Sequence, residues 1–310
     1  MIGPFSRSLS ILVYHRVVAD PDPLAPEQVC AEEFDSQLGV LSRWFNVLPL
    51  REAAARIREG TLPVRSACVT FDDGYADNVT VALPILRRRG VPATFFLATG
   101  FIDGGRMWND SVIEAVRAMP GDTLDASCIG LDSLDISTVD LRRAAIARAL
   151  PALKYLPLEE RQRLVEKLAS QAPRSLPSDL MMTTEQVRQL SASGMETGAH
   201  TVTHPILARL DPERAESEIR DSKHRLEAIT GKPVALFAYP NGKPGSDYHS
   251  GHVGMVRSLG FEAAVSTAWG VANAASDPFQ LPRFTPWDKT PGKFGLRLLQ
   301  NTFRTKAERA

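Results

Sequence analysis

The sequence predicts an α/β fold in which parallel strands form a closed or nearly closed barrel. Short apolar runs rich in β-branched and aromatic residues alternate with helical patterns along most of the chain, which is typical of a parallel sheet with helical crossovers. About seven such strand-helix units recur, a number that suits a barrel better than an open sheet. Polar residues directly follow several of the expected strands, as they do where parallel strands end at one rim.

The first third of the chain supplies the first strands and helices. A helix is expected over about 31–44, with Phe34 and Leu38 on one face. A second helix is expected over 76–89 and ends at Gly90, a typical C-cap residue. The extended segments expected here are 10–15, 46–50, 67–73 and 93–100.

A helical insertion is expected over residues 101–182. Segments such as RRAAIARAL and LEERQRLVEKLAS are polar or rich in alanine and contain no clear strand pattern. Insertions of this kind usually lie at the loop end of an α/β fold. The sequence therefore predicts a single domain over 1–310 that carries the insertion within it.

The alternation resumes after the insertion. Thr184 is a plausible N-cap for the first helix of this part. The closing segment KFGLRLLQNTFRTKAERA has apolar residues at helical spacing and a basic end, which suits a helix packed on the barrel. Docking of this segment to a partner or to an anionic membrane surface stays open. The remaining segments are strands at 195–200, 234–240, 261–267 and 281–286, and helices at 211–231 and 252–260.

The composition is that of an ordinary globular protein and gives no general attraction to nucleic acid. Of the 310 residues, 44% are hydrophobic, and 36 Lys and Arg balance 36 Asp and Glu. The 3 cysteines form no Cys-x-x-Cys pair, so neither a disulfide framework nor a cysteine zinc site is expected.

The N-terminal segment MIGPFSRSLSILVYHRV favours a first strand over a signal peptide. Its apolar run is short and has no cleavage signature. No run approaches the ~18 apolar residues of a membrane-spanning helix. We therefore expect no membrane span and a cytoplasmic protein, although a different start codon or a trimmed chain could hide an export signal.

Two acids and two histidines form the most informative pattern. Asp72 and Asp73 end one expected strand, and His200 and His204 follow another in HTVTHP. Two imidazoles and one carboxylate that leave a coordination position open are typical of a catalytic zinc site. Such a metal lowers the pKa of a water, and a neighbouring carboxylate can act as the base. On this pattern alone, either aspartate could be the ligand.

Three motifs carry a resemblance to a known family. VTFDDGY, GAHTVTHP and FAYPNG resemble the first three motifs of the polysaccharide deacetylase (NodB-homology) family, carbohydrate esterase family four. The resemblance covers about 10–110 and 183–290. It implies a distorted (β/α)7 TIM-like barrel and a hydrolase that removes acetyl groups from N-acetylated sugars in chitin, peptidoglycan or exopolysaccharides.

The resemblance also implies a role for each motif residue. Asp72 would be the general base, and Asp73, His200 and His204 would hold a divalent metal, with zinc the expected ion. The backbone N–H of Asn241 would stabilise the oxyanion. The other residues implied to lie on the substrate side are Tyr239, Pro240 and Gly242.

The chain departs from the family pattern at two points. Ala238 stands where the family has an arginine that orients the base, and Arg283 in LPRFTP could replace it from a neighbouring strand. No C-terminal Leu-x-His element is present to supply the general acid. We take His252 as the candidate acid, with His249 as the second choice, while His15 could line the same rim.

The function expected from these residues is metal-dependent N-deacetylation of an acetamido sugar or polysaccharide. Trp108 could stack on a sugar ring, as could Trp287, although packing explains either equally well. Three alternatives remain. One is a hydrolase of the same fold that acts on a non-sugar amide, another is a non-catalytic glycan-binding protein, and the third is an iron oxygenase, which has no use for the second aspartate.

Overall fold

The computed structural model describes residues 7–310, which fall into two units that we treat separately. The barrel unit comprises Val29–Ile102, Met182–Ala310 and the described residues before Pro21. The helical unit comprises Pro21–Gln28 and Asp103–Met181. The expected insertion thus has nearly the same limits as the helical unit, which additionally takes in Pro21–Gln28 from the N-terminal part of the chain.

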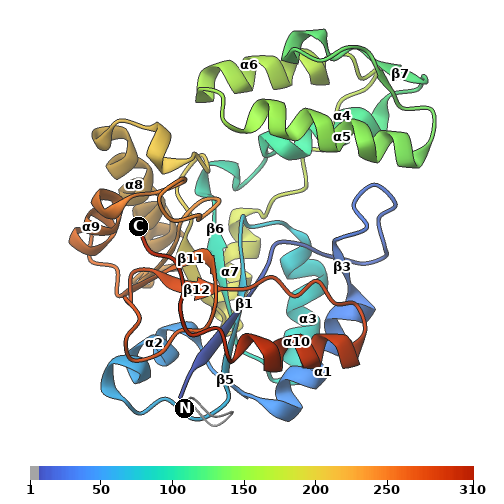
Figure 1. Ribbon diagram of the computed structural model, residues 1–310. Helices are drawn as coiled ribbons and strands as arrows, with labels where there is room; N and C mark the ends of the chain where they lie inside the picture. The colour runs from blue at the N-terminus through green and yellow to red at the C-terminus, as the bar shows by residue number, and fades with distance from the viewer. Residues whose placement is uncertain (1–6) are drawn as a thin grey trace. The chain divides into compact units, whose positions relative to one another are not determined.

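Seven parallel strands form a nearly closed barrel, as the sequence predicted (Figure 1). A parallel bridge between Leu12 and Phe284 joins the last strand to the first. Short β4 (Asn46–Val47) extends the sheet beside β5. The barrel strands, in spatial order, are β1 (Leu9–Tyr14), β5 (Ser66–Phe71), β6 (Ala93–Leu97), β9 (Glu196–Ala199), β10 (Leu236–Ala238), β11 (Ala263–Trp269) and β12 (Leu281–Arg283).

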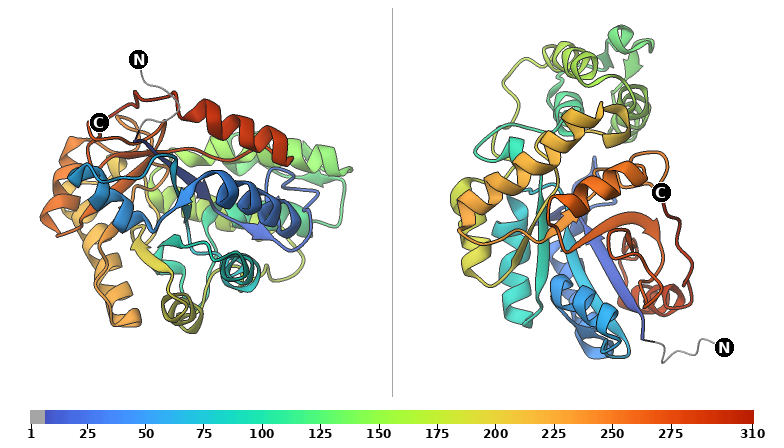
Figure 2. Two further views of the ribbon diagram at one scale, coloured as in Figure 1. Left: turned by 90° about the horizontal axis from the view of Figure 1, so that it is seen from below. Right: turned by 90° about the vertical axis from the view of Figure 1, so that its left-hand side faces the viewer.

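Helices of the barrel unit lie outside the strands in both views of Figure 2. A short parallel pair, β2 (Val17–Val18) and β3 (Val29–Cys30), lies beside them. Single turns of 3-10 helix occur at Thr99–Phe101 and Leu207–Arg209. The α-helices are α1 (Ala31–Trp44), α2 (Leu50–Glu59), α3 (Leu83–Arg89), α7 (Thr184–Ala192), α8 (Pro212–Thr230), α9 (Ser250–Ser258) and α10 (Pro291–Asn301).

Alternation along β5 explains how the barrel interior leads to the candidate site. Val69 and Phe71 are fully buried and join the core between strands and helices, where burial of each side chain contributes about 1.5–3 kcal/mol. Cys68 points to the other side, into the core inside the barrel. Thr70 continues this inner row, since its hydroxyl is bonded by the buried Arg283. Asp72 is the next inner position.

The helical unit has its own apolar core. Val112, Ala149 and Leu168 come from three different helices and are fully buried in it. The expectation that this segment contains no strand is wrong, because a small antiparallel pair is present. Its elements are α4 (Trp108–Ala118), β7 (Thr123–Leu124), a 3-10 turn (Ser127–Ile129), β8 (Leu134–Asp135), α5 (Val139–Lys154) and α6 (Leu158–Ala169).

Two further elements differ from the sequence prediction. The segment after Pro49 forms helix α2, which was not anticipated because the expected strand over 46–50 obscured its start. The helix expected over 76–89 begins as a π-helix at Asn78–Ala82 before α3; π-turns often occur at functional sites. Within residues 7–310, no helix combines the length and the apolar character needed to cross a bilayer.

Candidate metal and catalytic site

The two acids end β5 in a sharp and strained turn. The N–H of Asp72 donates to the carbonyl of Tyr14 at 2.9 Å, so Asp72 continues the pairing with β1. Asp73 then takes a φ of 75° and Gly74 a φ of 95°. A left-handed conformation costs a non-glycine residue roughly 1–3 kcal/mol and is often found at functional sites. The turn aims the two carboxylates differently.

The loop that follows β9 carries the two histidines and is also strained. Thr201 has a φ of 64° and His204 a φ of 53°. Buried Glu218 on α8 holds this loop, since its carboxylate accepts hydrogen bonds from the N–H groups of Val202 and Thr203 at 2.8 Å each and from the Thr203 hydroxyl at 2.7 Å. Glu218 therefore fixes the segment between the two imidazoles. The sequence prediction missed it, because it lies in an otherwise solvated, charged helix.

Asp73, His200 and His204 converge to form a candidate metal site. Oδ1 of Asp73 lies 3.4 Å from Nε2 of each histidine, and their possible ligand atoms all lie within 4.8 Å of one another. The two separations of 3.4 Å match those between ligand atoms placed tetrahedrally about 2.1 Å from one ion, which are about 3.4 Å apart. Oδ1 of Asp73 is buried and has no hydrogen-bond partner among the described residues. An unpaired buried carboxylate oxygen is costly, and a cation would satisfy it.

The orientation of His200 suits metal coordination. Its Nδ1 lies 2.7 Å from the carbonyl of Ala238. A carbonyl can only accept a hydrogen bond, so Nδ1 carries a proton, and Nε2, which faces Asp73, is the nitrogen that a metal would bind once the ring is neutral. Burial opposes protonation of this ring, but Asp73 and Asp72 outweigh it and raise the pKa of His200, and a cation bound there would displace that proton. A backbone carbonyl on the second ring nitrogen is a common arrangement around metal-binding histidines.

The charges of the site also fit a cation. Burial would raise the pKa of Asp73, but His200, His204 and His15 outweigh it and lower the pKa well below its ordinary value. Burial is the main cause that lowers the pKa of His204 to about 4. The site therefore presents an ionised carboxylate and a neutral imidazole at pH 7, which are the forms that bind divalent metals.

Arg283 reaches Asp72 from β12. Its Nη1 and Nη2 donate to Oδ1 and Oδ2 of Asp72 at 2.7 and 2.6 Å, and both side chains are almost fully buried. Further bonds to the carbonyl of Ser266 and the hydroxyl of Thr70 anchor the guanidinium. Burial opposes ionisation of Asp72, but Arg283 and then His200 outweigh it and lower its pKa. Asp72 is thus a fixed carboxylate beside the candidate metal site.

His15 belongs to the same cluster of charges. It directly follows β1, is exposed, and interacts electrostatically with Asp72, Asp73 and His204. Its carbonyl accepts a hydrogen bond from Nδ2 of the fully buried Asn78 at 2.9 Å. The sequence placed His15 at the rim only as a candidate, and its position after the strand paired with β5 is the signal that supports it.

The loop after β10 presents a backbone N–H without a partner. Asn241 has a φ of 58°, and within residues 7–310 its N–H makes no hydrogen bond. Its carbonyl accepts from the Thr267 hydroxyl at 2.7 Å. A side chain at Gly242 would come within 3.0 Å of the backbone of Thr267, and Pro240 is buried. The loop is therefore held tightly around the Asn241 amide.

Two of the expected site residues have structural tasks instead. The Tyr239 side chain is fully buried, stacks on Tyr248 at 3.9 Å and donates to the carbonyl of Phe279, so it is not available to a substrate. Nδ1 of His252 accepts the N–H of His249 in a cap of α9. The backbone of Leu207 bonds the same imidazole, and burial lowers its pKa. These contacts give no support to His252 as the acid.

Trp108 lies in the helical unit, at the start of α4. The guanidinium of Arg161 lies 4.9 Å from the centre of its ring. This contact is a packing interaction within the helical unit. A role of Trp108 in sugar stacking stays a prediction.

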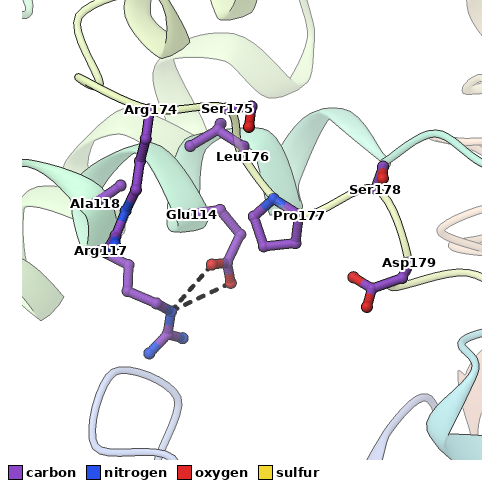
Figure 3. Close-up of a pocket in the computed structure, with 9 residues that line it drawn as sticks. All are labelled: Glu114, Arg117, Ala118, Arg174, Ser175, Leu176, Pro177, Ser178 and Asp179. Atoms are coloured by element: carbon purple, nitrogen blue, oxygen red, sulfur yellow. Dashed lines mark hydrogen bonds and ion pairs between the residues drawn. The ribbon is translucent and has the colours of Figure 1, made fainter.

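A surface pocket of about 490 Å³ lies wholly in the helical unit (Figure 3). Glu114 and Arg117 of α4 form one side and hydrogen bond to each other, and the segment 174–179 forms the other. Opposite charges offset each other there, and none of the residues expected to act on a substrate lines it. The chemistry is carried by the Asp72 and Asp73 cluster.

Comparison with known proteins finds a family whose model matches most of the chain. Residues 59–126 and 135–264 match the family model described as polysaccharide deacetylase, which accounts for well over half of the chain. YxkH of Bacillus subtilis strain 168, which bears a provisional description as a polysaccharide deacetylase, is 21% identical over 277 residues. That match spans 89% of this chain and 70% of YxkH.

Solved structures share the fold. PplD, described as a deacetylase of Streptococcus pyogenes in complex with acetate, is 22% identical with a TM-score of 0.62, over 95% of this chain and 97% of PplD. IcaB from Ammonifex degensii is 18% identical with a TM-score of 0.58, over 94% of this chain and 95% of IcaB. At these sequence identities, the likeness establishes a shared fold alone.

Proposed function

The chain belongs to the polysaccharide deacetylase family, and from that premise we propose that it is a metal-dependent hydrolase that removes N-acetyl groups from an acetamido sugar or polysaccharide. One observation carries the proposal. The buried cluster of Asp73, His200 and His204 lies beside a carboxylate, Asp72, that Arg283 holds ionised. A candidate metal site with an adjacent fixed base is suited to the hydrolysis of an unactivated amide.

Asp73, His200 and His204 would hold the metal. A divalent ion bound there would supply Lewis-acid polarisation of the acetyl carbonyl and favour ionisation of a water. Zinc suits a set of two imidazoles and one carboxylate that leaves a coordination position open. The carbonyl of Ala238 and the carboxylate of Glu218 keep the histidines in place.

Asp72 would accept a proton from the attacking water. Its carboxylate cannot rotate freely, because Arg283 binds both oxygens. The folded protein therefore holds the base in position before a substrate binds. The N–H of Asn241 would donate to the developing oxyanion; a donor that is already oriented stabilises such charge strongly.

His15 would protonate the departing amine. Its imidazole is exposed and interacts electrostatically with both aspartates, and histidine is the most frequent general acid in enzymes. His15 takes this role in our proposal in place of His252, because the latter caps α9. The balance is complete: one water and one amide give acetate and a free amine.

Acetate release tests this function. Purified protein is incubated with N-acetylglucosamine oligomers, and separately with small acetylated amides, before and after removal of metal by a chelator. We expect acetate from the oligomers, loss of activity on chelation and recovery with zinc. Release from the small amides alone would favour the non-sugar hydrolase, and no release from either substrate with metal bound would favour a glycan-binding protein.

A further inference from the structure

The outer side of α10 carries exposed large apolar side chains. Leu296 is 56% exposed, Leu299 41% and Phe303 61%, and nearby Trp287 is 54% exposed. We call these four residues the apolar face of α10. Soluble proteins seldom leave such side chains together in water without a use.

Two of the four residues belong to the helix itself. Leu296 and Leu299 are three positions apart in α10, so they lie on one side of it, and Phe303 follows in the turn after the helix ends at Asn301. The opposite side, with Phe294 and Leu298, is buried, and α10 contacts α1 on the outside of the barrel unit (Figures 1 and 2). The helix is thus held in place by one side while the other faces outward.

Trp287 is fixed beside this helix. Its ring meets that of Trp269 edge to face at 5.1 Å, and the guanidinium of Arg297 lies 5.5 Å from its centre. Trp269 in turn donates a hydrogen bond to Asn301 of α10 at 3.0 Å. The exposure of Trp287 therefore does not come from a loose loop.

Positive charge surrounds the apolar face. Residues 289–307 contain no acid in a chain whose formal net charge is zero. Two basic residues of this segment are paired with acids, Arg297 with Asp288 and Lys289 with Glu33 at 3.1 Å, and the exposed acid Glu308 follows the segment. The exposed basic residues of the segment are Lys289, Lys293, Arg304 and Lys306.

We propose that this face docks the protein on an anionic membrane surface, with α10 lying in the plane of the interface. Leucine, phenylalanine and tryptophan on one side of a helix flanked by lysine and arginine are typical of interfacial helices. The basic residues complement acidic lipid headgroups. The proposal concerns attachment and does not depend on the proposed deacetylation.

Flotation of the full chain with lipid vesicles tests the proposal. The vesicles are phosphatidylcholine alone or phosphatidylcholine mixed with phosphatidylglycerol. We expect binding to the mixed vesicles that weakens as salt is added. The triple variant Leu296→Ser, Leu299→Ser, Phe303→Ser should bind at least about tenfold more weakly. The matched control replaces exposed apolar residues of the helical unit: Val139→Ser, Leu141→Ser and Tyr155→Ser.

A charge variant separates the two contributions. Lys293→Gln with Lys306→Gln should weaken binding to the mixed vesicles about tenfold or more, whereas Arg163→Gln with Lys167→Gln on α6 should not. Equal thermal unfolding of all variants establishes that the fold is intact. Equal binding by the triple variant, or no binding by the parent chain, overturns the proposal. Self-association that the triple variant abolishes, without vesicle binding, assigns the face to a second copy instead.

Discussion

Both Nη atoms of Arg283 donate to the carboxylate of Asp72, at 2.7 and 2.6 Å, although the two residues are 211 positions apart in the chain. Forked contacts of this kind fix orientation as well as charge. The resemblance to the deacetylase family places an orienting arginine at the position of Ala238, on β10. We infer that Arg283 does the same task from β12.

Replacement of Arg283 with methionine should destabilise the protein and reduce deacetylation. The variant leaves the buried carboxylate of Asp72 without its partner, and removal of one member of a buried ion pair costs roughly 3–5 kcal/mol. Chemical denaturation measures the loss in unfolding free energy. The double variant Arg283→Met, Asp72→Asn should recover part of this stability but no activity. A double variant as unstable as the single one would show that the pair does not account for the loss.

Glu218 should control metal affinity although it does not touch the metal site. Its carboxylate holds the N–H groups of Val202 and Thr203 between the two histidines. Glu218→Ala should therefore weaken zinc binding about 10–100-fold, as measured by competition with a chromogenic chelator. Exposed Glu216, on the same helix, supplies the control Glu216→Ala. Equal zinc affinity in the two variants would contradict the role of Glu218.

His15→Gln should separate protonation of the leaving group from the other steps. An amine leaves poorly without a proton, so acetate release from N-acetylated sugars should fall about 10²–10⁴-fold in kcat. An aryl acetate ester has a leaving group that needs no proton, and its hydrolysis should fall far less. Equal losses on both substrates would mean that His15 acts in some other way.

His252 should make folding sensitive to acid. Burial lowers its pKa below the ordinary value of 6.5, so the folded chain binds fewer protons there than the unfolded chain. Its contribution to stability is present above about pH 6.5 and is lost as the pH falls through the lowered pKa. His252→Gln keeps an acceptor for the cap of α9 and should flatten the decline of unfolding free energy from pH 7 to pH 5. His224→Gln, at an exposed histidine, is the control.

The barrel could be predicted from the sequence because each strand and helix carries its own local pattern. The apolar run before Asp72 marks β5, and Gly90 ends α3 with a φ of 62°. Helix α2 was missed because a proline and a short extended segment precede it, and two of the four residues that it buries are alanines. Local patterns also could not show the small strand pair of the helical unit, since two-residue strands leave no periodicity.

The candidate site was only partly predictable, for physical reasons. Adjacent acids and spaced histidines are visible in the chain, but the contacts that orient them come from distant segments. Glu218 lies in a helix that resembles any solvated helix. Tyr239 and His252 are polar residues near a motif, yet hydrogen bonds to Phe279 and His249 give them structural roles. Only the folded structure distinguishes the residues that orient the site from polar residues with a purely structural role.

The division of labour between the two adjacent acids is the central claim, and one preparation tests it most directly. Metal content and acetate release are measured together on Asp72→Asn. We predict that this variant keeps the metal content of the parent protein, because Asp73, His200 and His204 are untouched, while acetate release falls at least about 10²-fold. Release at the parent rate, or loss of the metal along with activity, would contradict the assignment of Asp72 as the base beside a separate metal site.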